Sequence, residues 1–548
     1  MKNLFLFIFL SITSASVFSQ DRYIVFFKDK ASSPYTISNP SAYLSQRAIE
    51  RRTRMGIAID SSDLPVNPNY LQAVINSGAK ILNQSRWFNS VTIQADTNQV
   101  LNIAQNSFVK NYQKVFGSNL FRGQRKNKFD EFYEAEKTSV NNFNFNGSYG
   151  GAENQIKMIG ADVLHQSNFS GRNSIIAVID AGFRNTNTHK AFDSLRLQNR
   201  ILGTWDFSRN DAFVYDYSNH GTSVLSCIAA NVPDSMIGTA PHASYYLLRS
   251  EEEATEYLVE EYNWTAAAEF ADSAGADIIN SSLGYTEYDA RSQSYTYQDM
   301  DGNTAIISIA AKTAVSKGVL VVNSAGNSGS SSWYFIGAPA DVEEVFSIGA
   351  LAPDRSLAGF SSRGPNANGS IKPDVVAQGG PAFIARANNG SYGFGSGTSF
   401  SGPIIAGFAA CSWELYKTIY PNSKPSQVIQ WIKANANNAN SPNNDIGFGL
   451  PDAAKMFLNL SVERNKNKQF GVYPNPSNGQ LFFLFNTLQN ENFELHLYNL
   501  IGESIYNSNF NAIELINGIE LPANISRGMY IISIQSSVSS YKTRLVIE

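Results

Sequence analysis

The sequence predicts an α/β fold with a mainly parallel sheet for its central region, preceded by an α+β unit and followed by a small β-sandwich. The runs 174–179 and 320–322 are almost wholly apolar, which is typical of strands buried on both faces of a parallel sheet. Runs of small and apolar residues at 220–230 and 404–410 are typical of tightly packed helices. A chain of 548 residues is long enough for roughly two to four domains.

The first 19 residues have the composition of a secretory signal peptide. Lys2 is followed by an apolar run at 4–10 and by small residues up to Ser19, after which we expect cleavage. The apolar run is too short to span a membrane. A formal net charge of −4 and the lack of a long Lys/Arg block exclude nucleic acid from the expected partners.

Residues 20–145 predict a small α+β unit followed by a linker. Strands are expected at 22–27 and 90–95, and an amphipathic helix is expected at 43–52. The polar stretch 123–149 predicts an exposed linker that is well placed for cleavage. We interpret the basic residues of the helix as a solvated face: Arg47, Arg51, Arg52 and Arg54.

The chain has two cysteines, Cys227 and Cys411. Both lie in predicted buried helices among small and apolar residues, and we interpret them as buried free thiols. A disulfide between them is the alternative, and it requires Cα atoms within about 7 Å of each other.

Four polar residues stand where predicted strands end or predicted helices begin: Asp180, His220, Asn327 and Ser399. Taken singly, each has an ordinary structural role, as a turn residue, a structural histidine or a helix N-cap. Together they supply every role of acyl transfer. Ser399 is the candidate nucleophile, His220 its base, and Asp180 the residue that orients the imidazole. Asn327 and the Ser399 backbone N–H are the candidate oxyanion hole.

The central region resembles the subtilisin-like serine peptidases (subtilases) over roughly residues 150–458. The motifs that carry the resemblance, in chain order, are Val178-Ile179-Asp180-Ala181-Gly182, His220-Gly221-Thr222, Asn280-Ser281-Ser282-Leu283-Gly284, Ala325-Gly326-Asn327 and Gly397-Thr398-Ser399. The order Asp, His, Ser differs from that of α/β-hydrolases and of chymotrypsin-type enzymes. The resemblance implies a doubly wound sheet over 146–460 and a serine endopeptidase that hydrolyses peptide bonds through an acyl-enzyme.

The resemblance also implies where a substrate binds. Ser282, Leu283 and Gly284 would pair with the substrate backbone by β-augmentation. Ala325 and Gly326 would form a wall of the pocket for the residue that precedes the scissile bond. Gly337 has no side chain to fill the floor of that pocket, so we predict a preference for larger apolar residues there. Two departures from the family pattern are Ala181, where Ser or Thr is usual, and the segment 400–404 after the nucleophile.

The proposed chemistry requires no cofactor, although calcium is common in the family. The loop 299–303 offers carboxylate oxygens but lacks the Glu that an EF-hand has at its twelfth position. We therefore interpret it as a polar loop and predict no metal ligand, with calcium as the open alternative. We interpret the acidic group 251–253 with Glu256, Glu260 and Glu261 as a solvated helix face. Its alternative role is to bias substrate choice towards basic peptides.

The same resemblance assigns the flanking units. Residues 20–145 would be a propeptide and linker that assists folding and inhibits the zymogen. The stretch 461–469 predicts a linker, and strands such as 493–499 and 528–534 predict a β-sandwich at 470–548. Tyr473-Pro474-Asn475-Pro476, followed by Asn499-Leu500-Ile501-Gly502 and Gly528-Met529-Tyr530, resembles the sorting domain of Bacteroidetes type IX secretion cargo. This implies passage through the periplasm and the type IX machinery to a secreted or cell-surface location.

The expected partners are therefore protein or peptide substrates, the chain's own propeptide and the secretion machinery. A surface adhesin that keeps a peptidase-like fold without turnover is the main alternative, and the four intact roles argue against it. An esterase or a peptide ligase with the same residues is also compatible with the chemistry.

Overall fold

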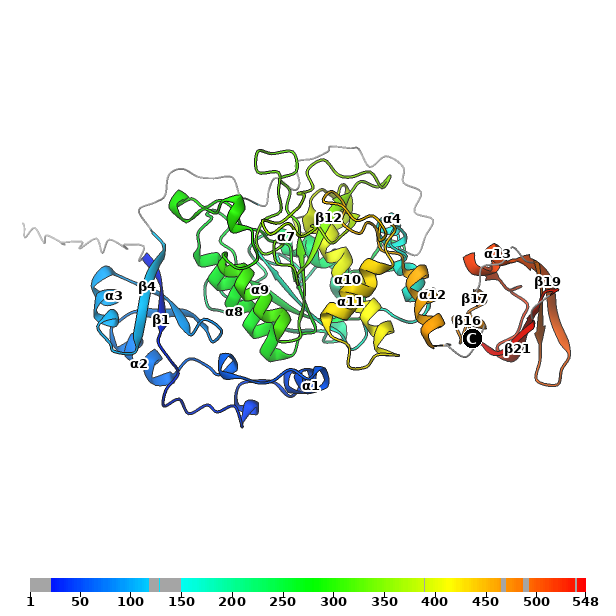
Figure 1. Ribbon diagram of the computed structural model, residues 1–548, viewed down its shortest axis with the longest axis horizontal. Coiled ribbons are helices and arrows are strands. Elements are labelled where there is room, and N and C mark those ends of the chain that lie inside the picture. Colours follow the sequence, from blue (N-terminus) through cyan, green and yellow to red (C-terminus); the bar gives the residue numbers. More distant parts are fainter. Residues whose placement is uncertain are drawn as a thin grey trace, which may run out of the picture.

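The computed structural model describes residues 21–117, 128, 149–388, 390–464, 470–485, 492–537 and 540–548. The predicted signal peptide and most of the predicted linker at 123–149 lie outside these residues. Three units follow one another along the chain, and Figure 1 shows them from blue through green and yellow to red. Within the described residues, no helix combines the length and the apolar character needed to cross a membrane.

The central unit is built on a seven-stranded sheet in the order β13-β12-β11-β10-β5-β9-β6. All of its strand pairs are parallel. The strands are β5 (Ile175–Asp180), β6 (Ile201–Asp206), β9 (Ser244–Arg249), β10 (Ile278–Ser281), β11 (Leu320–Ser324), β12 (Phe346–Leu351) and β13 (Val375–Gln378). The predicted α/β fold with a doubly wound, parallel sheet is confirmed.

The apolar runs predicted as strands are apolar because both faces of this sheet are covered by helices (Figure 1). Val178 of β5 and Val322 of β11 belong to the core shared with helices α7 (His220–Ala229) and α10 (Thr398–Lys417). Their neighbours Ile179 and Val321 belong to the core on the opposite face, under α8 (Val259–Ala274) and α9 (Ile306–Ser316). Alternate side chains of one strand thus enter two different cores.

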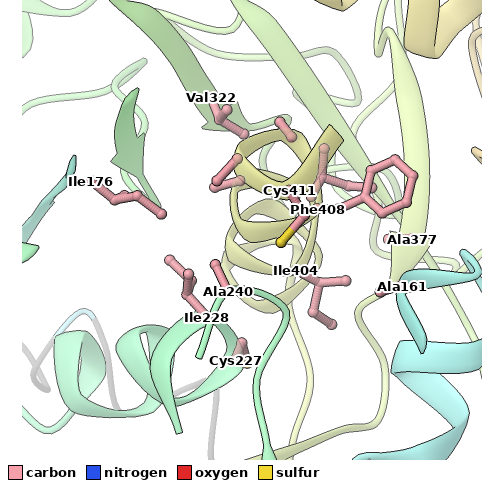
Figure 2. Packing of buried hydrophobic residues seen from close by; sticks show 14 of the residues in the cluster. Ala161, Ile176, Cys227, Ile228, Ala240, Val322, Ala377, Ile404, Phe408 and Cys411 are labelled. Atoms are coloured by element: carbon pink, nitrogen blue, oxygen red, sulfur yellow. The ribbon is translucent and has the colours of Figure 1, made fainter. Parts of the chain in front are cut away.

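Helix α10 lies against the sheet and against α7. Its residues Ile404, Phe408 and Cys411 belong to the same buried core as Ile228 of α7 and Val322 of β11, and the Phe408 ring points towards Ala377 of β13 (Figure 2). Both cysteines are buried and free, as predicted. The Cys227 Sγ lies near the Ser223 carbonyl oxygen, and the Cys411 Sγ lies near the Thr239 carbonyl oxygen. The remaining elements of this unit are α4 (Glu153–Lys157), α5 (Ala161–Gln166), α6 (Asp193–Leu197), β7 (Asn231–Val232), β8 (Met236–Ile237), β14 (Ala382–Arg386), β15 (Ser391–Gly395), α11 (Pro425–Ala434) and α12 (Ala453–Arg464).

The amino-terminal unit is an antiparallel sheet in the order β2-β3-β1-β4 with helices on one face. Its elements are β1 (Asp21–Phe27), α1 (Gln46–Met55), α2 (Pro68–Asn76), β2 (Lys80–Ser85), β3 (Ser90–Ala95), α3 (Thr97–Ala104) and β4 (Val109–Phe116). Val25 of β1 packs under α2 and α3, whereas its neighbour Ile24 enters the core beneath α8 of the central unit. The second face of this sheet is therefore buried against the central unit.

Helix α1 begins three residues later than predicted, because the Ser45 hydroxyl caps it by accepting the Ala48 N–H. The interpretation of its arginines as a solvated face is wrong for Arg51 and Arg52, which are each 1% exposed. Both pair with Asp272 of α8. The error has a physical reason: the acidic partner lies about 220 residues away in the sequence and no local pattern reveals it.

The carboxyl-terminal unit is the predicted β-sandwich, with sheets β16-β17-β20 and β19-β18-β21-β22 around one apolar core. Helix α12 continues to Arg464, four residues into the stretch predicted as a linker. The elements are β16 (Phe470–Tyr473), β17 (Gln480–Phe485), β18 (Asn492–Tyr498), β19 (Ser504–Asn511), α13 (Ala512–Asn517), β20 (Ile519–Glu520), β21 (Gly528–Gln535) and β22 (Ser540–Ile547).

Candidate active site

The polar residues singled out in the sequence gather at the carboxyl edge of the central sheet. Asp180 is the last residue of β5, and Asn327 follows β11 by three residues. His220 is the first residue of α7 and Ser399 the second residue of α10. The carboxyl ends of parallel strands share one edge, and open α/β sheets place their sites at that edge.

Asp180 and His220 form a fully buried pair. The His220 Nδ1 lies 2.8 Å from Asp180 Oδ1, which also accepts the Ala181 N–H at 2.7 Å. An ionised carboxylate only accepts hydrogen bonds, so Nδ1 carries the proton in this pair and Nε2 is left to act as a base. A Cβ on Gly221 would lie 2.3 Å from the Gly182 carbonyl oxygen, so a glycine beside the histidine permits this close packing.

Ser399 is nearly buried at the start of α10 and is tied to the segment that follows β10. Its Oγ lies 3.4 Å from the Ser282 carbonyl oxygen, and the Ser282 hydroxyl donates to the Ser399 carbonyl at 3.0 Å. The ring of Phe400, the next residue, has its centroid 6.2 Å from that of the His220 imidazole. The turn that carries Ser399 therefore borders the histidine on one side and the extended segment on the other.

The side chain of Asn327 has a fixed orientation. Its Oδ1 accepts the Thr398 N–H at 2.8 Å and the Thr398 hydroxyl at 2.9 Å. Because the oxygen is held in this way, the amide NH₂ group points away from Thr398 and is available as a donor. Thr398 also accepts the Gly326 N–H at 3.1 Å. Sequence reasoning assigned Thr398 no role, although it stands inside the Gly-Thr-Ser motif.

Ser399 and Asn327 line one cavity of about 200 Å³. The six residues predicted to contact substrate line the same cavity: Ser282, Leu283, Gly284, Ala325, Gly326 and Gly337. A Cβ on Gly337 would lie 3.2 Å from the Thr286 methyl group, so a side chain there would press on the cavity wall. Thr286, Trp333 and Phe335 also line the cavity and were missed in the sequence. The signal that could have revealed Trp333 and Phe335 in the sequence is the presence of aromatic residues in a Ser-rich loop.

The acidic residues at the start of α8 do not form the solvated face that we expected. Glu260 and Glu261 are fully buried. Glu261 accepts hydrogen bonds from the hydroxyls of Tyr288 and Tyr295, and burial raises its pKa to about 7. The loop 285–295 folds over this turn of the helix and removes it from water. The residue pattern of α8 alone does not reveal that this loop covers it.

The loop 299–303, considered above for calcium, and a group of three glutamates differ in their local bonding. In the loop 299–303, the Asp301 carboxylate accepts the N–H groups of Asn303 and Thr304, both at 2.8 Å, as a polar loop would. In the part of the chain that the structure describes, the carboxylates of Glu251, Glu256 and Glu260 are close enough to share an ion. The ammonium group of Lys128 lies among these three carboxylates.

Comparison with known families assigns all three units. The family model described as "Subtilase family" matches residues 171–449. The model described as "Peptidase S8 propeptide domain, Bacteroidota" matches residues 22–130, and the one described as "Secretion system C-terminal sorting domain" matches residues 471–548.

Among curated relatives, subtilisin DY of Bacillus licheniformis is 30% identical over 288 residues, which cover 52% of this chain and 90% of the relative. Subtilisin E of Bacillus subtilis (strain 168) is 33% identical over 285 residues, which cover 51% of this chain and 65% of the relative. A thermophilic serine proteinase of Bacillus sp. (strain AK1) is 32% identical over 237 residues, or 43% of this chain and 51% of the relative. Every one of these alignments leaves nearly half of this chain or more unmatched.

Proposed function

Because the chain belongs to the subtilase family, and is a serine endopeptidase made with a propeptide, we propose that Asp180, His220 and Ser399 are its catalytic triad. The observation that carries this proposal is the buried Asp180–His220 pair, 2.8 Å between Oδ1 and Nδ1, whose imidazole lies 6.2 Å between ring centroids from Phe400, the residue after Ser399. A binding protein has no need of an oriented imidazole at that position.

In the proposed reaction, Ser399 Oγ attacks the peptide carbonyl while His220 Nε2 takes its proton. Asp180 keeps the imidazole in the required tautomer and stabilises its charged form. The Asn327 amide and the Ser399 backbone N–H donate to the oxyanion that develops on the carbonyl oxygen. His220 then protonates the leaving amine, which leaves an acyl-enzyme, and water activated by His220 hydrolyses it.

We propose that substrate binds in extended form along Ser282, Leu283 and Gly284, whose backbone would pair with the peptide. Ala325 and Gly326 form the facing wall of the same cavity, and Gly337 leaves room beside Thr286. The predicted preference for a larger apolar residue before the scissile bond follows from that room. A peptide series varied at this position tests it, and a preference for Gly or Ala would contradict it.

We propose that the amino-terminal unit inhibits the zymogen until the chain is cut between residues 123 and 150. The proposal is supported by Lys128, which lies within the part matched as propeptide and lines the cavity that contains Ser399. The sorting domain indicates a secreted or cell-surface protein. We also propose that residues 1–19 are removed as a signal peptide and that the type IX machinery recognises the sorting domain.

Reaction with a fluorophosphonate tests the assignment of the nucleophile. We expect the matured wild-type enzyme to be labelled at Ser399, and Ser399→Ala to remain unlabelled. Ser412→Ala is the matched control, because this buried serine lies on the same helix, far from the site. Labelling of the Ser399→Ala protein at another serine would contradict the proposal.

A further inference from the structure

We propose that Glu251, Glu256 and Glu260 form a subsite that selects a lysine or arginine side chain of the peptide substrate, and that Lys128 of the propeptide fills it in the zymogen. The inference rests on the proposed function, since it names the substrate class of the same cleft. It replaces the interpretation of these glutamates as a solvated helix face.

The position of Lys128 is the first observation. Its Nζ lies 2.8 Å from Glu251 Oε2, 2.9 Å from Glu256 Oε2 and 3.0 Å from Glu260 Oε1. Its backbone N–H donates to the Glu253 carbonyl at 3.4 Å. An ammonium group has three N–H donors, and here three carboxylates surround it. The lysine therefore shows how a basic side chain of an approaching peptide chain fits this group.

The second observation is that the acidic group opens into the catalytic cavity. Lys128, Glu251 and Glu256 line the same cavity as Ser399 and the segment Ser282–Gly284. Lys128 lies within the part of the chain matched as propeptide, residues 22–130. When the chain is cut after Lys128 and the propeptide leaves, Glu251 and Glu256 face the space in which we place the substrate.

The carboxylates are held by contacts that do not involve the propeptide. Glu251 accepts the hydroxyl hydrogens of Tyr285 and Ser250. Glu260 accepts the N–H groups of Glu252 at 2.7 Å and of Tyr257 at 3.1 Å. These bonds keep the acidic group in place after the propeptide leaves. Buried carboxylates without a counter-charge are costly, and a basic substrate side chain relieves that cost whereas a neutral one does not.

A peptide panel on the enzyme matured from the full chain tests the inference. Each of the four positions on the amino-terminal side of the scissile bond carries Lys, Arg, Gln, Leu or Glu in turn. We expect kcat/KM at one position to be at least about tenfold higher for Lys or Arg than for Gln. Lys is expected to equal or exceed Arg, because a compact ammonium matches three separate acceptors.

Variants of the glutamates test which side chains produce the preference for a basic residue. Glu256→Gln and Glu251→Gln should each lower the ratio of kcat/KM for the Lys peptide to that for the Gln peptide about tenfold. Glu256→Asp should retain part of the preference. Glu287→Gln is the matched control, because Glu287 is exposed and lies two residues after Tyr285. The wild-type panel stands as a test even where a variant fails to fold.

The outcomes separate this inference from the proposed function. If no peptide is cleaved, the proposed function fails, and the subsite fails with it. If peptides are cleaved without a basic preference, or if the preference survives in both Gln variants, only the subsite is overturned. If the preference for Lys or Arg appears only after EDTA has removed bound cations, the three carboxylates bind a cation. That result would also overturn the subsite.

Discussion

Arg52 of the propeptide helix α1 makes a two-point ion pair with Asp272 of helix α8, in which Nη2 lies 3.0 Å from Oδ1 and 2.7 Å from Oδ2. Both side chains are fully buried. Asp272 also accepts from Arg51 and Arg86, so three propeptide arginines meet at one carboxylate of the central unit. Nearby, Glu269 accepts from the Ser85 hydroxyl at 2.6 Å and from the Arg86 N–H at 2.8 Å.

Asp272→Asn should loosen the propeptide, because it removes the charge of the one carboxylate that Arg51, Arg52 and Arg86 share. Breaking such a buried pair costs about 3–5 kcal/mol. In the uncut Ser399→Ala background, the α1 amides should therefore exchange hydrogen faster, by the factor in rate that this loss of free energy implies. Arg54→Met, which changes an exposed arginine of the same helix, is the control. Equal exchange rates in the two variants would show that Asp272 does not anchor the propeptide.

Asp180→Asn should lower kcat about 10⁴-fold with little change in KM, because an amide cannot hold the imidazole in the tautomer that leaves Nε2 as a base. Steady-state kinetics of the matured enzyme on a neutral peptide checks this expectation. Circular dichroism of the variant provides the control for folding. A loss of less than tenfold would mean that His220 works without Asp180 or that another residue is the base.

Asn327→Ala should lower kcat by about 10²–10³-fold, the range found when the oxyanion amide of subtilisin is removed, with KM nearly unchanged. Thr398→Val should have a smaller effect on kcat, because the Thr398 backbone N–H still holds Asn327 Oδ1. Thr398→Ser should restore the wild-type rate, since it keeps the hydroxyl. If Asn327→Ala acts on KM alone, the amide binds substrate without stabilising the oxyanion.

The preference for basic residues should depend on pH. The pKa of Glu256 is raised to about 7, mainly by burial and also by the neighbouring charges of Glu251 and Asp289, although Lys128 acts to lower it. Burial also raises the pKa of Glu260. A carboxyl group with a raised pKa is neutral below that pKa and charged above it. The ratio of kcat/KM for the Lys peptide to that for the Gln peptide should therefore rise as pH increases through about 7.

This ratio is the proper measurement because any effect of pH on the chemical step affects both peptides alike and cancels. When the propeptide leaves, Lys128 no longer lowers the pKa of Glu256. The pKa of Glu256 in the mature enzyme should therefore be at least as high as in the zymogen. A ratio that stays constant across this range, or that falls with rising pH, would contradict the account of Glu256.

The fold and the chemical residues were predictable because the signals that reveal them are local. Val178 and Ile179 enter cores on opposite faces of the sheet, and a strand buried on both faces leaves a continuous apolar run that can be read directly. Asp180, His220, Asn327 and Ser399 each stand at the end of a strand or the start of a helix, in short motifs.

Residues that depend on distant partners were not predictable. Arg52 reads as a surface residue until Asp272 of another unit is placed beside it. Glu261 likewise reads as exposed until Tyr288 and Tyr295 cover it. Charged side chains are normally solvated, so a sequence pattern assigns them to the surface unless it can also supply the buried counter-charge or donor.

Autoprocessing of the full chain tests the central claim most directly. Time-resolved intact mass of the refolded wild-type chain, beside Ser399→Ala, measures it. We expect a cut between residues 123 and 150 in the wild type only, followed by the appearance of fluorophosphonate-reactive enzyme. If both chains stay intact and Ser399 remains unreactive, the account is contradicted and the chain is a binding protein on a peptidase fold.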